Sequence, residues 1–168
     1  EIYIKGDSVM LGYYKNQKLT DDDFDNGWFR TGDIGFFDED GFLHINGRQK
    51  NVIISKSGEN VFPEEIEDIL NRNPFVQESM VYGEQDEKHT EIIAVQIVTD
   101  AEAFIEYSEK NQVKITPELV NDIISEAVKE TNKELPVYKQ IRKFHVRDSE
   151  FEKTTTQKIK RYLVKNVN

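Results

Sequence analysis

The chain has 168 residues and a formal net charge of −10 at pH 7, with 37% hydrophobic and 32% charged residues. This composition indicates a folded globular protein, and the net negative charge disfavours general nucleic-acid binding because nucleic acids are themselves anionic. The absence of cysteine excludes disulfides, a cysteine nucleophile and a thiolate zinc site. The sequence has neither a secretory signal pattern nor an apolar run of membrane-spanning length, and we expect a cytoplasmic protein.

The N-terminal part of the chain carries the signals of short strands. Residues 1–6 alternate as a strand does and begin without methionine, which suggests a piece of a longer protein. The apolar runs 34–37 and 42–45 flank an Asp-Gly turn and therefore predict a β-hairpin. A further short strand is predicted over residues 51–55, followed by the loop 56–60.

Helices and strands are grouped in the rest of the chain. A helix is expected to begin at Pro63, because proline suits the first helical position and Ile66, Ile69 and Leu70 then share one face. The remaining patterns predict paired strands over 76–82 and 91–98 with a charged turn between them, helices over 101–110 and 116–135, and a last strand over 141–146. Because strands and helices segregate rather than alternate strictly, the fold class is α+β.

Two early segments carry residues that suit nucleotide binding. Residues 27–35 hold three glycines and Asp33. Glycine lets the backbone approach a ligand closely, and a carboxylate can accept hydrogen bonds from vicinal hydroxyls. Arg48, in the run Gly-Arg-Gln-Lys, offers a cation beside it. From these residues alone, a glycine-rich turn with Asp33 as a turn former, and a surface salt bridge of Arg48, are open alternatives.

A basic segment follows the acidic body of the chain. Residues 139–165 contain only three acidic residues against the basic residues Lys139, Arg142, Lys143, Arg147, Lys153, Lys158, Lys160, Arg161 and Lys165. Such a segment suggests a local anionic ligand or a solvated basic surface. Lys158 follows a polar loop of three threonines at the point where a helix signal begins. It could enter a site and neutralise charge there, or be an exposed residue at a helix start.

Six motifs occur in a fixed order along the chain. They are Gly-Tyr-Tyr (12–14), Gly-Trp-Phe-Arg-Thr-Gly-Asp-Ile-Gly (27–35), Asp-Gly-Phe-Leu-His-Ile-Asn-Gly-Arg (40–48), Asn-Val-Ile-Ile-Ser-Lys-Ser-Gly-Glu-Asn-Val-Phe-Pro-Glu-Glu-Ile-Glu (51–67), Leu-Pro-Val-Tyr-Lys (135–139) and Thr-Thr-Thr-Gln-Lys-Ile-Lys-Arg (154–161). This series resembles the adenylate-forming (AMP-binding) superfamily of acyl-CoA synthetases, peptide-synthetase adenylation domains and beetle luciferases. The resemblance covers nearly the whole chain and is greatest to bacterial long-chain fatty-acid–CoA ligases.

The resemblance implies a division of the chain into two parts. Residues 1–48 would be the β-rich end of a large N-terminal AMP-binding domain. Residues 49–168 would form a small mobile C-terminal lid domain, with an antiparallel sheet flanked by helices. Lys50 falls at the hinge of the family, where the small domain swings on the large one.

The resemblance also implies roles for individual residues. Asp33 would hold the ribose hydroxyls of ATP or AMP, and Arg48 would bind near the ribose and phosphate. Lys158 matches the lysine that drives acyl-adenylate formation, although Gln157 stands where most members have glycine, which would stiffen the loop. The loop facing the pantetheine channel would consist of Ser57, Gly58, Glu59 and Asn60.

The implied activity is AMP-forming acid–thiol ligation. A carboxylate and ATP would give acyl-AMP and pyrophosphate, and CoA would then give acyl-CoA and AMP. Expected co-substrates are ATP with Mg²⁺, whose metal site lies outside this chain, and CoA. The expected partner is the missing N-terminal domain, without which the chain should be inactive. An enzyme that loads a carrier protein, a non-catalytic docking module, and peripheral membrane contact of the full protein remain open.

Overall fold

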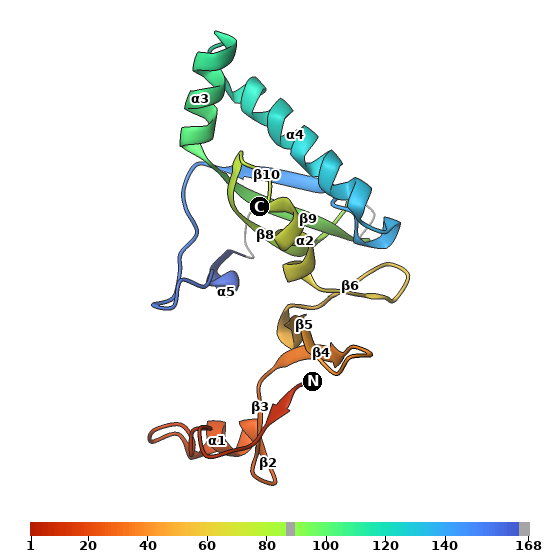
Figure 1. The fold of residues 1–168 in the computed structure, drawn as a ribbon, viewed down its shortest axis with the longest axis vertical. Coiled ribbons are helices and arrows are strands. Elements are labelled where there is room, and N and C mark those ends of the chain that lie inside the picture. The colour runs from red at the N-terminus through yellow and green to blue at the C-terminus, as the bar shows by residue number, and fades with distance from the viewer. Residues whose placement is uncertain (87–89, 165–168) are drawn as a thin grey trace. The chain divides into compact units, whose positions relative to one another are not determined.

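The computed structural model describes residues 1–86 and 90–164, and the chain divides into two compact units, Glu1–Val52 and Ile53–Asn168 (Figure 1). The assignment of residues 1–48 and 49–168 to the two domains of a larger enzyme stays a prediction. Among the described residues, no helix is long and apolar enough to cross a membrane.

The first unit consists of short strands and short helical segments. Its elements are β1 (Tyr3–Ile4), α1 (Gln17–Asp23), β2 (Phe24–Asp25), β3 (Trp28–Arg30), β4 (Asp33–Phe37), β5 (Leu43–Arg48) and the 3₁₀ turn η1 (Gln49–Asn51). Strand β3 lies between β1 and β2, and β4 pairs with β5 in a separate antiparallel hairpin. At the predicted Asp-Gly turn, the Asp38 carboxylate accepts hydrogen bonds from the amides of Asp40 and Phe42, and Gly41 takes a left-handed φ of 84°. The hairpin prediction is therefore confirmed.

The second unit contains a three-stranded sheet and the longer helices. Its elements are β6 (Ile53–Ile54), β7 (Asn60–Val61), α2 (Pro63–Leu70), β8 (Val76–Gln85), β9 (Glu91–Thr99), α3 (Ala101–Asn111), α4 (Pro117–Glu134), the 3₁₀ turn η2 (Val137–Lys139), β10 (Lys143–Arg147) and α5 (Arg161–Val164). Strand β9 is central, antiparallel to β8 and parallel to β10. The parallel pair follows from the connection, because α3 and α4 carry the chain back across the sheet between β9 and β10. The expected α+β class is confirmed.

The two faces of this sheet carry different apolar clusters. Successive strand residues point to opposite faces, so the sheet can be packed on both sides. The main core joins the sheet to α2, α3 and α4 and includes Ile66, Leu70, Val81, Ile93, Val95, Ile97, Phe104, Ile124, Ala127 and Val128. A smaller cluster joins the sheet to the C-terminal segment and consists of Met80, Val98, Phe151 and Val164. Figure 1 accordingly shows α4 and α5 on opposite sides of the sheet.

Helix ends and strand lengths follow local chemistry. Thr116 caps α4 by accepting a hydrogen bond from the Leu119 amide at 3.2 Å, as a threonine before Pro117 predicts. The strand expected over 51–55 is only two residues long, because the chain first turns through η1. The last strand begins at Lys143, and the charged turn expected before β9 lies partly outside the described residues, at 87–89.

Candidate active site

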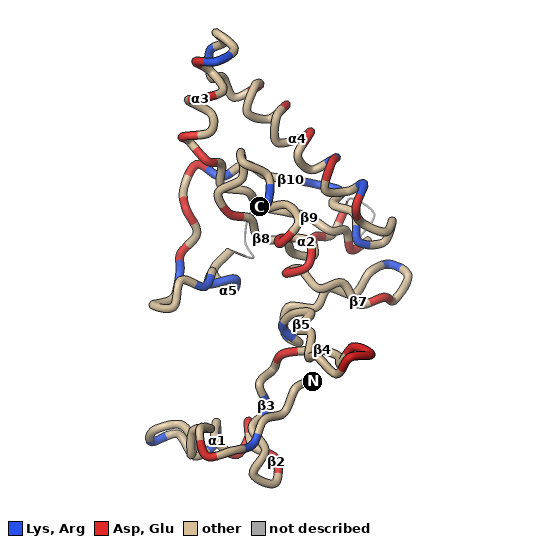
Figure 2. The backbone as a smooth tube through the Cα atoms, in the orientation of Figure 1, with Lys and Arg blue, Asp and Glu red and all other residues tan. Residues whose placement is uncertain are grey.

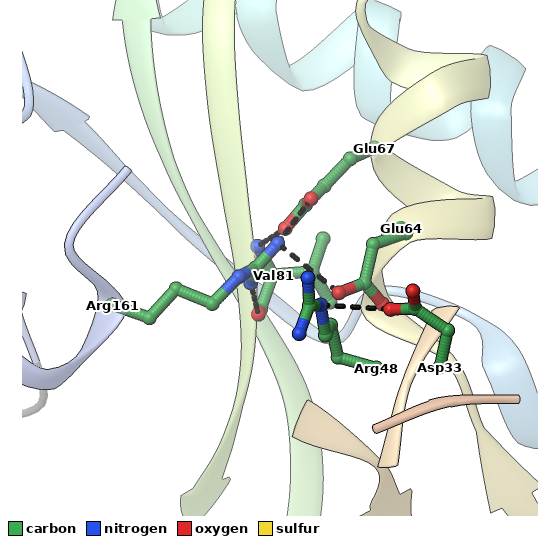
Figure 3. Close-up of polar contacts among 6 residues, drawn as sticks. All are labelled: Asp33, Arg48, Glu64, Glu67, Val81 and Arg161. Atoms are coloured by element: carbon green, nitrogen blue, oxygen red, sulfur yellow. Dashed lines mark hydrogen bonds and ion pairs between the residues drawn. The ribbon is translucent and has the colours of Figure 1, made fainter. Parts of the chain in front are cut away.

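Asp33 and Arg48 lie opposite each other on the β4–β5 hairpin. Arg48 Nε contacts Asp33 Oδ1 at 2.8 Å, and its Nη1 donates to the Thr31 carbonyl at 3.3 Å (Figure 3). The Arg48 side chain is 49% exposed and that of Asp33 is 27% exposed. The surface ion pair that the sequence left open is thus present. A polar pair at the end of a hairpin, with both side chains reachable from solvent, could also receive a nucleotide, and that role stays a prediction.

The loop predicted to face the pantetheine channel is the tip of the β6–β7 hairpin. The Ser55 amide donates to the Glu59 carbonyl at 2.9 Å, and Ser55 Oγ accepts from the Glu59 amide at 3.1 Å. Gly58 takes φ +85°, and no atom lies within 4 Å of a β-carbon built there. The glycine is thus explained by the left-handed turn. The segment is an exposed, internally bonded loop tip, and its contact with a thiol channel is untested.

A pocket of about 650 Å³ lies beside this loop, entirely within the second unit. Its lining residues are Ser55, Lys56, Ser57, Thr90, Glu91, Ile92, Ile93, Val137, Tyr138, Gln140 and Arg142. Tyr138 and the isoleucines offer apolar surface, and Lys56 and Arg142 are cations at its wall. The pocket was not predicted from the sequence. The segment after Leu-Pro-Val contains the aromatic Tyr138 and the cation Arg142, but no sequence pattern indicates that this segment contacts the β6–β7 loop.

Lys158 lies in a tight hairpin that forms the C-terminal segment. Lys153 and Ile159 form an antiparallel bridge. The Thr154 amide donates to the Lys158 carbonyl at 2.8 Å, and the Lys158 amide donates to Thr154 Oγ1 at 3.2 Å. The expectation that Lys158 begins a helix is wrong, because α5 begins only at Arg161. The Thr154 hydroxyl accepts from the Lys158 amide and helps to close a turn instead.

Gln157 occupies the strained position of this turn. Its φ is +61°, in the left-handed region that glycine adopts freely and other residues adopt at a cost of roughly 1–2 kcal/mol. This backbone conformation gives a physical reason for the glycine that the resemblance leads one to expect at this position. Gln157 therefore supports the hairpin without breaking its register, at some cost in stability.

Lys158 differs from the other basic side chains near it. Its side chain is exposed, and it forms no ion pair or hydrogen bond with the residues that the structure describes. The other cations of residues 139–161 all have partners: Lys139 with Glu65, Arg142 with the Val137 carbonyl, Lys143 with Glu84, Arg147 with Gln96, Lys153 with Glu78, Lys160 with Glu152, and Arg161 with Glu67. Figure 2 shows basic positions at α5 and acidic positions on α2. The charge at Lys158 is thus available to an external anion.

A partly buried ion pair lies directly after the hairpin, with the Arg161 side chain 22% exposed and that of Glu67 10% exposed. Arg161 Nη2 pairs with the Glu67 carboxylate, and Arg161 Nη1 donates to the Val81 carbonyl at 3.1 Å (Figure 3). Glu67 also accepts a hydrogen bond from the Val81 amide at 2.6 Å. Burial raises the pKa of the Glu67 carboxyl, an effect that Arg161 and the Val81 amide partly offset. Sequence analysis did not predict this pair.

Lys50 lies in the 3₁₀ turn η1, three residues before the second unit begins at Ile53. It is exposed. This place in the chain suits a hinge, and that role stays a prediction. Within residues 1–86 and 90–164, no three His, Asp or Glu side chains lie close enough together to hold a metal ion.

The chain is similar in sequence to a family of known enzymes. A model of the AMP-binding enzyme C-terminal domain matches residues 65–158, from α2 to Lys158. The chain belongs to this family. It is 35% identical to a long-chain-fatty-acid–CoA ligase of Mycobacterium tuberculosis over 178 aligned positions, covering 98% of this chain and 29% of the ligase. It is 45% identical to the 2-succinylbenzoate–CoA ligase of Bacillus licheniformis over 101 positions, covering 60% of this chain and 21% of that enzyme.

A solved structure resembles the whole chain. The o-succinylbenzoate CoA synthetase of Bacillus subtilis, in complex with its acyl-adenylate intermediate, matches with a TM-score of 0.77 and 30% identity, covering 100% of this chain and 30% of that enzyme. Further structures of that enzyme contain AMP, or ATP and a magnesium ion. The relatives named above are CoA ligases, and the family model confirms the resemblance to adenylate-forming enzymes. The chain spans less than a third of these relatives.

Proposed function

We propose that this chain is the C-terminal part of an ATP-dependent, AMP-forming acyl-CoA ligase, in which Lys158 drives formation of the acyl-adenylate. The observation that carries the proposal is the unpaired state of Lys158. In a segment where the neighbouring cations are paired with the protein itself, this one lysine is held on a hairpin with its charge directed to none of the described residues. Membership of the AMP-binding enzyme family supplies the anionic substrates that such a charge would meet.

The first half-reaction needs a cation because its reactants repel each other. A substrate carboxylate attacks the α-phosphate of ATP, and pyrophosphate leaves. A lysine ammonium that contacts both anions stabilises the charge of the transition state, and lysine is positively charged at neutral pH. The Lys158 hairpin is suited to this because its backbone is fixed by the Lys153–Ile159 bridge while the side chain stays exposed.

The nucleotide would be held by the other unit. Asp33 uses Oδ1 toward Arg48, and a carboxylate has further acceptor capacity for ribose hydroxyls. Arg48 offers donors to a phosphate from a half-exposed position. Magnesium would arrive with ATP as part of the substrate, and we assign no residue of this chain to it.

The second half-reaction would use the β6–β7 loop. We propose that rotation about Lys50 withdraws Lys158 and presents Ser57, Gly58, Glu59 and Asn60 to the thiol of CoA, which attacks the acyl carbonyl and releases AMP. The pocket beside this loop supports the assignment. Its lining combines apolar side chains with the cations Lys56 and Arg142 and one carboxylate, Glu91, and the two cations would contact the phosphates of CoA while the thiol reaches the loop.

We propose a long-chain fatty acid as the substrate. The support for this substrate is the sequence match to the mycobacterial long-chain ligase, which extends over 98% of the chain at 35% identity. A cytoplasmic location remains part of this proposal, as do the two-domain assignment of residues 1–48 and 49–168 and the need for an N-terminal domain.

Substitution of Lys158 tests the proposal in the complete enzyme. Lys158→Ala should slow ATP–pyrophosphate exchange by about 100- to 1,000-fold, the usual cost of removing one stabilising group from a transition state. It should spare thioester formation from supplied acyl-adenylate. Lys160→Ala is the matched control, because Lys160 lies two residues away and is already paired with Glu152. Equal losses in both half-reactions would contradict the role of Lys158, and exchange by the isolated chain would contradict the need for a second domain.

A further inference from the structure

The Lys158 hairpin is fixed to the sheet at both of its ends. Before the turn, Lys153 Nζ contacts Glu78 at 2.8 Å, and the Phe151 amide donates to the same carboxylate at 3.3 Å. After the turn, the Lys160 amide donates to the Glu152 carbonyl at 2.8 Å. Arg161 follows at once and enters the partly buried pair with Glu67. The backbone that carries Lys158 is therefore anchored at Arg161, three residues further along the chain, by the ion pair with Glu67.

This contact completes the hydrogen bonding of an edge strand. Strand β8 is at the edge of its sheet, so some of its backbone groups have no neighbouring strand. At Val81, the amide donates to Glu67 and the carbonyl accepts from Arg161. Glu67 and Arg161 therefore bind each other and the same strand residue. Arginine suits this geometry because its planar guanidinium can donate in two directions at once.

The contact joins the Lys158 hairpin to helix α2. Glu67 lies on α2, which follows the β6–β7 hairpin in the chain, and Arg161 lies at the end of the Lys158 hairpin. The two residues are 94 positions apart in the sequence. Arg161 links the 152–161 segment to α2 through two carboxylates, Glu67 and, at 3.9 Å, Glu64.

We propose that Arg161 is a positioning residue for Lys158. It touches no reacting atom, and it acts by fixing the return arm of the hairpin to Glu67 and to the edge of β8. This inference rests on the proposed role of Lys158 in adenylation. Without Arg161, the hairpin would keep its internal bonds and the contacts of its first arm with Glu78, but its return arm would lose its ionic connection to the sheet. A displacement of the catalytic cation by about 1 Å can cost about 100-fold in rate.

The first test uses the complete enzyme and separates position from stability. Arg161→Gln should lower kcat of ATP–pyrophosphate exchange about 10- to 100-fold with KM for ATP unchanged, and thioester formation from supplied acyl-adenylate should be retained. Arg72→Gln is the matched control, because Arg72 forms an exposed pair with Glu134 at 3.9 Å. If the rates of both half-reactions fell by the same fraction as the fraction of enzyme that is unfolded, the proposal would be overturned.

A paired apolar replacement removes both charges of the Glu67–Arg161 pair together. The double variant Glu67→Leu, Arg161→Met also removes the partners of the Val81 amide and carbonyl, and it should therefore melt below the wild type. Assayed well below its own melting temperature, where it is folded, it should stay slow in adenylation. Wild-type kcat in the folded double variant would show that the pair is only structural. Arg161→Lys should recover part of the rate lost in Arg161→Gln, and no recovery would contradict the positioning role.

Hydrogen exchange in the 168-residue chain tests the anchoring itself. In Arg161→Gln, the amides of Thr154, Lys158 and Lys160 should exchange faster while the amides of β9 stay protected. Uniform acceleration across the second unit would instead indicate general destabilisation and overturn the proposal. Lys158→Ala, assayed beside these variants, separates the two claims. If that variant adenylates normally, the proposed function fails; if it is inactive and the apolar double variant is fully active, only the positioning role fails.

Discussion

Residues 1–52 and residues 53–164 differ in where their apolar side chains lie. In the second region, Ile66, Leu70 and Ile97 are fully buried and belong to one continuous core. In the first, Phe37 is 71% exposed and Phe42 is 68% exposed. Gly47 is the one buried residue of the first 52. Hairpins and helix caps are thus present in a region that has no apolar core of its own, because they depend on bonds between residues close in sequence.

The difference between the two regions predicts unequal costs of mutation. Leu70→Ala should lower the free energy of unfolding by about 2–5 kcal/mol, because it leaves a cavity in a packed core. Phe37→Ala removes a larger side chain from the first region and should change it by less than about 0.5 kcal/mol. Chemical denaturation of the chain measures both. A comparable loss for Phe37→Ala would break the comparison and indicate that the first region is packed.

The junction between the regions provides the second prediction. Lys50→Pro should slow thioester formation in the complete enzyme about tenfold more than adenylation, equivalent to about 1.4 kcal/mol in the barrier. Proline restricts both its own φ and the preceding residue, and so stiffens a hinge. Lys50→Ala removes the side chain without that restriction and is the control. Equal effects of the proline on the two half-reactions would place the hinge elsewhere.

Backbone strain within the second region provides the third. Gln157→Gly should raise the free energy of unfolding by about 0.5–1 kcal/mol, because glycine relieves the left-handed strain but adds freedom to the unfolded chain. Gln112 has the same residue type and a φ of +53° at the end of α3, far from the hairpin in sequence. Gln112→Gly should stabilise the chain similarly. A loss of stability for Gln157→Gly would mean that the glutamine side chain contributes more than the strain costs.

The smallest effect concerns a tyrosine on the sheet. Burial, followed by the hydrogen bond to Glu84, raises the pKa of Tyr82 from 10.0 to about 12. Because the pKa of Tyr82 is higher in the folded chain than in the unfolded chain, the neutral phenol stabilises the folded state. This stabilisation is complete below pH 10 and is lost as pH rises toward 12. Ultraviolet titration should show one tyrosine ionising near pH 12. That late step should be absent in Tyr82→Phe, and its persistence would assign it to another tyrosine.

Local patterns were sufficient to predict many of the elements. The apolar stripe and the Thr116-Pro117 start predicted α4, and the Asp-Gly turn predicted the β4–β5 hairpin, because these signals involve residues close in sequence. The order of motifs was sufficient to predict the family, which the match over residues 65–158 confirms.

The parts that were missed depend on distant or conformational facts. The Glu67–Arg161 pair joins residues 94 positions apart, and no local pattern encodes it. The pocket beside Ser57 is lined by three separate chain segments. The sequence indicates a helix that begins near Lys158. The Thr154 hydroxyl bonds to the Lys158 amide instead, and a hairpin results.

The shielding of Val81 has a consequence for the behaviour of the protein in solution. An uncovered edge strand is a template for strands of other molecules, and such pairing leads to aggregation. Glu67 and Arg161 occupy the Val81 amide and carbonyl and place charge at this point of the edge. Glu67 and Arg161 thereby oppose the pairing of another strand at this point of β8, and their removal should make the protein more prone to aggregate.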